Sequence, residues 1–303
     1  MKFEYMGLLI DPDEIPWSKS HAALPIVYKF SDDTFRVIFA SRNDENHSAV
    51  GYAEFDIQDP IGSITFSSSP VIEPGRVGGF DWQGVLPSSI VQKNGVMNLY
   101  TSAWNRGFPD PMWYSSIGLA QSYDQGSSFE KYGNSPIMTR SDCDPCLVAS
   151  PMVLYEDGTW HCWYVSCSQW VSHQSGLQSY YNIKYAHSSD GINWIRSGET
   201  VIDFIDGETN IARMSVIKLD DIYHGWFCSS SRNKPYSIKK AVSPDGKKWY
   251  RDEQFSYLGS GLAWDDEMQS YPWVIKDNDN LYMFYCGNAF GKTGIGLARA
   301  TID

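Results

Sequence analysis

The chain has 303 residues, and its 36 acidic against 24 basic residues give a formal charge of −12. This balance argues against a nucleic acid or an anionic membrane as partner, because binding phosphates requires clustered basic charge. Aromatic residues make up 15% of the chain, with 12 Trp, 19 Tyr and 14 Phe. Such a share favours strands and, where it exceeds what a core needs, sugar-binding clefts.

Five similar segments follow one another along the chain, and their first residues are spaced 58 to 64 residues apart. Each consists of an apolar run, a turn rich in Asp, Asn or Gly, and an alternating aromatic run, a pattern that predicts a β-hairpin. A repeat of this length is typical of solenoids and propellers. The segments are residues 25–41, 87–102, 151–166, 214–229 and 272–287.

A short string ending in alanine follows each hairpin and predicts a third strand; Val50-Gly-Tyr-Ala53 is the first example. In three repeats an Asp-containing turn then leads into an aromatic that starts a fourth strand. We therefore predict a single-domain, all-β, five-bladed propeller over residues 1–303, with four antiparallel strands per blade. The last repeat lacks its fourth strand, and we expect residues 3–9 to supply it.

In a propeller, the loops that lead into the inner strands and leave the second strands share one face of the ring. Functional side chains are expected there, and basic residues gather at these positions despite the acidic composition. Converging guanidinium groups suit a carboxylate or phosphate, so we expect an acidic or phosphorylated sugar as ligand. The candidate substrate-binding residues are His21, Arg42, Trp82, Trp104, Arg106, Arg213, Arg232, Tyr271 and Asn288.

The strings Phe80-Asp-Trp-Gln-Gly-Val-Leu-Pro-Ser-Ser89 and Ser188-Ser-Asp-Gly-Ile-Asn-Trp194 resemble those of the five-bladed propeller glycoside hydrolase superfamily. That superfamily includes family 43 arabinanase- and xylosidase-like, family 32 invertase-like and family 130 mannoside-phosphorylase-like enzymes. The resemblance implies catalytic carboxylates at the start of inner strands, where one acid of raised pKa and a second carboxylate act on the glycosidic bond.

The sequence departs from the family 43 pattern at three inner strands. Leu24-Pro25 and Ser150-Pro151 stand where Asp-Pro is common, and Arg213 lies where a general acid is expected. The full family 43 catalytic triad is therefore not carried over. Three carboxylates slightly upstream of inner strands remain as candidates: Glu208 and Glu267 for acid and base, with Asp81 as the third carboxylate.

Two function classes stay open. The first is a carbohydrate-active enzyme that cleaves or transfers a glycosidic bond, by hydrolysis or by mannoside-phosphorylase-like chemistry. The second is a non-catalytic glycan-binding module in polysaccharide biosynthesis. No cofactor is expected, although the resemblance leaves room for a structural Ca²⁺ near Asp142 and Asp144. Because residues 1–13 resemble no signal peptide and the six cysteines follow no secreted framework, we expect a cytoplasmic protein that binds no membrane.

Overall fold

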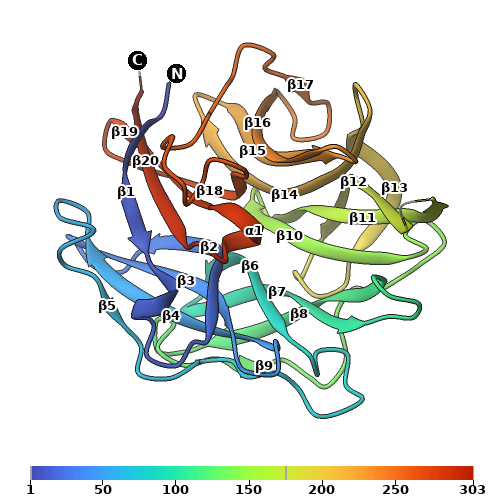
Figure 1. The fold of residues 1–303 in the computed structure, drawn as a ribbon, viewed down its shortest axis with the longest axis horizontal. Coiled ribbons are helices and arrows are strands. Elements are labelled where there is room, and N and C mark those ends of the chain that lie inside the picture. The colour runs from blue at the N-terminus through green and yellow to red at the C-terminus, as the bar shows by residue number, and fades with distance from the viewer. Residues whose placement is uncertain (1, 175, 303) are drawn as a thin grey trace.

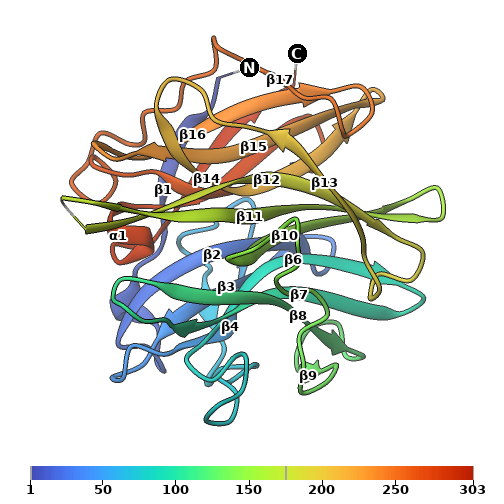
Figure 2. The same ribbon diagram turned by 90° about the vertical axis from the view of Figure 1, so that its right-hand side faces the viewer.

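The computed structural model describes residues 2–174 and 176–302, and the chain is built almost wholly of β-strands. In Figure 1 the sheets follow one another around the molecule in chain order, and Figure 2 shows them from the edge. The first two sheets have four strands each, in the order β2-β3-β4-β5 and β6-β7-β8-β9. Their bounds are β2 (Ser20–Lys29), β3 (Thr34–Arg42), β4 (Ser48–Asp56), β5 (Thr65–Phe66), β6 (Val85–Lys93), β7 (Val96–Arg106), β8 (Trp113–Ser122) and β9 (Glu130–Lys131).

An eight-stranded sheet follows in the chain. It has the order β10-β11-β12-β14-β15-β16-β17, with β13 paired to β12. Between β12 and β14 the register contains a single parallel pair, Tyr181 with Asn210. The bounds are β10 (Leu147–Glu156), β11 (Thr159–His173), β12 (Gly176–Ser188), β13 (Ile195–Ile202), β14 (Glu208–Leu219), β15 (Ile222–Ser231), β16 (Lys234–Ser243) and β17 (Tyr250–Arg251).

The last sheet joins the two ends of the chain, as the sequence predicts. Its order is β1-β20-β19-β18, so β1 (Glu4–Ile10) is the outer strand beside β20 (Ile295–Thr301). Figure 1 shows the two termini next to each other. The remaining elements are β18 (Ser270–Asp277), β19 (Asn280–Cys286), the 3-10 turn η1 (Pro12–Glu14) and the one-turn helix α1 (Asn288–Gly291).

The five predicted hairpins are all present as antiparallel pairs. Their turns follow from local chemistry: Asn94-Gly95 and Asp157-Gly158 have positive φ at both residues. Two-residue hairpin loops with this conformation match the right-handed twist of the flanking strands. These turn residues therefore favour the observed hairpins through local conformation.

Four inner strands have an irregular backbone near their N-terminal ends. They are β2, β10, β14 and β18. Leu24, Ser150, Arg213 and Tyr271 all have positive φ, between 39° and 55°, and the register to the second strand shifts there. Such bulges redirect side chains.

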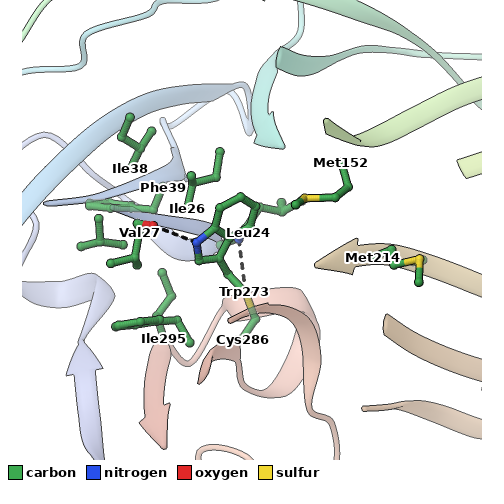
Figure 3. Close-up of a cluster of buried hydrophobic side chains, with 14 of the residues drawn as sticks. Leu24, Ile26, Val27, Ile38, Phe39, Met152, Met214, Trp273, Cys286 and Ile295 are labelled. Atoms are coloured by element: carbon green, nitrogen blue, oxygen red, sulfur yellow. Dashed lines mark hydrogen bonds between the residues drawn. The ribbon is translucent and has the colours of Figure 1, made fainter. Parts of the chain in front are cut away.

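Below these bulges the centre is apolar. Figure 3 shows Leu24 beside Trp273, with Met152 and Met214 on two further inner strands. The Trp273 indole donates to the carbonyl oxygen of Val27 at 2.9 Å. Among the residues that the structure describes, no helix is long and apolar enough to cross a membrane.

Candidate functional site

Three of the predicted binding residues line one pocket at the N-terminal ends of the inner strands. His21 from β2, Arg42 from β3 and Tyr271 from β18 line a cavity of about 100 Å³, which we call the mouth pocket. Its remaining lining comes from three inner-strand side chains and three neighbours. These are Ala23, Leu24, Leu86, Ala40, Ser48 and Phe290.

The mouth pocket is electropositive. Arg42 donates to the Asn46 amide oxygen at 2.8 Å, and its pKa is lowered by burial. Burial, with added repulsion from Arg42 and Lys292, lowers the pKa of His21 to about 4. The imidazole is therefore neutral at pH 7, with Nδ1 2.8 Å from the Ser20 hydroxyl. No carboxylate lies among the described residues that line the pocket, so a ligand anion would meet no competing negative group.

Aromatic rings form one wall of the mouth pocket. Tyr271 and Phe290 stack with ring centroids 6.4 Å apart, and Tyr236 contacts both. Burial raises the pKa of Tyr271 well above its usual value. Phe290 is 44% exposed. Sequence reasoning overlooked Phe290, although it lies two residues after Asn288 in a loop at the predicted functional face.

Arg213 is not among the residues that line this pocket. Its side chain is 1% exposed, and it donates to the carbonyl oxygens of Pro25 at 2.5 Å and Pro87 at 3.4 Å. These carbonyls belong to β2 and β6, so one guanidinium links three inner strands. Burial lowers its pKa to about 10, which still leaves it charged at neutral pH. Ligand contact by Arg213 stays a prediction.

The candidate catalytic carboxylates Asp81 and Glu208 each form an ion pair with a basic residue on an outer strand. Asp81 is 2.6 Å from the Lys131 ammonium on β9. Glu208 receives two hydrogen bonds from Arg251 on β17, at 3.0 and 2.8 Å. In both cases, a carboxylate near the start of an inner strand forms an ion pair with a residue on the outermost strand. Neither lines the mouth pocket, and their catalytic roles remain predictions.

Glu267, the third candidate, is exposed on the loop before β18. Its backbone N–H and that of Met268 donate to the Asn288 amide oxygen at 3.0 and 2.8 Å. The Asn288 amide nitrogen donates in turn to the Ala263 carbonyl oxygen and to Asp266, both at 2.9 Å. Asn288 thus fixes the loop that carries Glu267.

The remaining predicted residues are not among those that line the mouth pocket. The Trp104 indole donates to Ser48 at 2.8 Å, behind the pocket wall. Trp82 contacts the His47 ring at 5.5 Å. Arg106 is exposed at the end of β7. Arg232 lies 3.2 Å from His173 Nδ1 and borders a neighbouring hollow.

The residues near Asp142 do not fit a Ca²⁺. Asp144 is fully buried and accepts from Arg196 at 2.8 Å, Ser166 at 2.6 Å and Lys184 at 3.4 Å. Two cations already neutralise this carboxylate, and a metal would be repelled. Within the described ranges, no group of three His, Cys, Asp or Glu side chains could hold a metal ion.

Comparison with known proteins places the chain in a family. No family model matches it. It is 32% identical to the uncharacterized proteins MT1551 and Rv1502 of Mycobacterium tuberculosis, over 98% of this chain and 99% of each relative. The chain belongs to the family of these mycobacterial proteins.

Solved structures show the same fold at lower identity. A structure of BT0996 in a complex with RGII has a TM-score of 0.80 at 19% identity, covering 99% of this chain and 92% of that protein. Beta-1,2-mannobiose phosphorylase from Listeria innocua, in complex with beta-1,2-mannobiose, has a TM-score of 0.74 at 13% identity, covering 100% and 97%. This chain therefore has a β-propeller fold like that of solved glycoside hydrolases and mannoside phosphorylases.

Proposed function

We propose that this protein binds a carbohydrate that carries an anionic group, and that the anion lies against Arg42 in the mouth pocket. The observation that carries the proposal is the convergence of His21, Arg42 and Tyr271 on a cavity without a carboxylate in its described lining. The carbohydrate part of the proposal is supported by the fold, since structural neighbours are glycoside hydrolases and mannoside phosphorylases.

The pocket contains the elements that an anionic sugar needs. The Arg42 guanidinium can donate two parallel hydrogen bonds to a carboxylate or phosphate. His21 and Ser48 offer neutral polar contacts for ring hydroxyls, and the Tyr271–Phe290 pair supplies an apolar face for the sugar ring. Binding in place of cleavage is favoured because Asp81 and Glu208 are engaged in ion pairs within separate sheets.

Calorimetric titration of glucuronic acid and glucose-6-phosphate, each against its neutral counterpart, tests the proposal. The anionic sugars should bind and glucose should not. Arg42→Gln should weaken binding about 10- to 100-fold, since a hydrogen bond to a charged group contributes about 1.5–3 kcal/mol. Arg140→Gln is the matched control, because Arg140 is exposed and contacts Tyr114 on another sheet. Equal affinity of wild type and Arg42→Gln would contradict the proposal.

A second candidate function, cleavage of a glycosidic bond, is favoured by the exposed Glu267 on the loop that leads to Tyr271. Nitrophenyl glycosides offered with and without phosphate separate hydrolysis from phosphorolysis. Turnover that falls by orders of magnitude in Glu267→Gln, with unchanged unfolding, would establish an enzyme. Binding of anionic sugars without turnover would support the glycan-binding function.

For the fold, we infer five blades of four strands, with the eight-stranded sheet counted as two. The inference is supported by its junction, where one residue pair, Tyr181 with Asn210, joins β12 to β14. The recurrence of a bulged inner strand on each side of that junction, in β10 and β14, supports the same division.

A further inference from the structure

Three hollows adjoin one another in a row that begins at the mouth pocket. Phe290 lines both the mouth pocket and a second hollow of about 310 Å³, the bridge pocket, which Arg232 and Met268 also border. Ser231 and Lys234 line both the bridge pocket and a third hollow of about 530 Å³, the outer pocket. The row of hollows extends from the start of β2 to the starts of β14 and β16.

The sizes of the hollows indicate an elongated ligand. Pockets that enclose a small ligand usually measure about 300–1,000 Å³, and the mouth pocket, at about 100 Å³, is well below that range. The bridge and outer pockets lie within it. A sugar anchored at Arg42 would therefore extend beyond the mouth pocket, and the adjoining space lies over Phe290.

Phe290 is held in a conformation that local sequence does not favour. Ala289 and Phe290 have φ values of 51° and 64°, a left-handed conformation that costs a non-glycine residue about 1–2 kcal/mol. Backbone strain of this kind gathers at functional sites. Here it places a 44% exposed ring where the mouth and bridge pockets meet, and Figure 1 shows α1 beside the centre of the ring.

The outer pocket differs chemically from the mouth pocket. Four basic and four acidic side chains line it, and two of its ion pairs are Arg251–Glu208 at 2.8 Å and Lys240–Asp252 at 3.2 Å. Four serines, including Ser231 and Ser237, add hydroxyl groups. A surface of balanced charge with many donors and acceptors suits neutral sugar hydroxyls, which both donate and accept, better than it suits an anion.

We propose that the three pockets form one extended site for an oligosaccharide, with its acidic sugar at Arg42, the next sugar over Phe290 and neutral sugars in the outer pocket. This inference rests on the proposed function and adds the length, polarity and direction of the ligand. Lys239 and Ser237 line only the outer pocket, and Arg42 lines only the mouth pocket.

A length series tests the site on the full chain. The probes are glucuronic acid and gluco-oligosaccharides of two, three and four residues that end in glucuronic acid, titrated by calorimetry. Affinity should rise at least about tenfold between one and four residues, as each added sugar fills contiguous space. Lys239→Gln and Ser237→Ala should remove most of this gain and leave glucuronic acid binding unchanged. Phe290→Ala should weaken both short and long probes.

Lys248→Gln is the control, because Lys248 is exposed beyond β16, outside the outer pocket. Equal affinity for all lengths, with glucuronic acid still dependent on Arg42, would overturn the extended site and leave the proposed function intact. A length gain that survives Lys239→Gln and Ser237→Ala would also overturn it. If no acidic probe binds, both the proposed function and this inference are wrong.

Discussion

Arg213 of β14 donates a hydrogen bond of 2.5 Å to the carbonyl oxygen of Pro25, which lies 188 residues earlier on β2. A second bond reaches Pro87 on β6, so the guanidinium links three inner strands. A charge buried this deeply is usually paired with an opposite charge. Here the guanidinium instead donates to two backbone carbonyls, and its Nε has no hydrogen-bond partner among the described residues. Both carbonyls lie where the register of their strand shifts.

Arg213→Met should lower the free energy of unfolding by about 2–4 kcal/mol, because two buried carbonyls lose their donor. Urea unfolding followed by circular dichroism measures the change. Arg140→Met, at an exposed position, should be neutral. An unchanged midpoint for Arg213→Met would show that relief from burying the charge offsets the lost hydrogen bonds.

Asp144, on the loop that leads into β10, forms ion pairs with Lys184 on β12 and Arg196 on β13. Asp144→Asn should cost about 3–5 kcal/mol, since it leaves buried cations without a partner. Asp157→Asn is the control, because this exposed residue sits in a turn that Asn also favours. A loss below that of the control would contradict the assignment.

The Asp144 carboxylate should make the free energy of unfolding depend on pH. Burial raises the pKa of Asp144, but hydrogen bonds from Ser166 and Cys143 and the charges of Lys184 and Arg196 outweigh it, so the net pKa is lowered. The stabilisation is therefore present above the unfolded-state pKa of about 4 and lost as pH falls below it. Unfolding from pH 6 to pH 2 should be less pH-dependent in Asp144→Asn than in the wild type.

Asp81 and Lys131 should show coupling in a double-mutant cycle of Asp81→Asn and Lys131→Met. The side chain of Asp81 is 8% exposed and that of Lys131 33%, so we expect an interaction of about 1 kcal/mol, between the values for surface and buried pairs. The cycle is read from unfolding free energies. A coupling near zero, together with lost turnover in Asp81→Asn, would instead indicate a catalytic carboxylate.

His21 should make stability depend on pH in a different window. Its pKa is lowered to about 4 by burial and nearby cations, whereas an unfolded histidine titrates near 6.5. The unfolded chain binds the extra proton between these values, so stability falls as pH drops from about 6.5 to 4. His21→Gln should reduce that loss by roughly 2 kcal/mol or less, given partial exposure. Parallel curves for both proteins would refute the shift.

Much of the candidate site followed from sequence because the propeller repeat fixes where strand ends lie. Once the hairpins were aligned, His21, Arg42 and Tyr271 fell at one face, and the structure brings them into one pocket. The same reasoning gave no basis for predicting the ion pairs of Asp81 and Glu208, since their partners Lys131 and Arg251 lie 50 and 43 residues away on outer strands.

The sequence alone determined the hairpins, the propeller class and the pairing of the N-terminal strand with the last repeat. The hairpins depend on local turn chemistry and on alternation along strands, which act within tens of residues. The pairing of the N-terminal strand with the last repeat joins distant residues, and the sequence predicts it because that repeat lacks its fourth strand. Only the tertiary structure decided which charged groups are neutralised and which remain open to a ligand. That outcome depends on contacts such as Arg213 with Pro25 and Phe290 with Tyr271, which arise when the inner strands converge and which no periodicity in the sequence encodes.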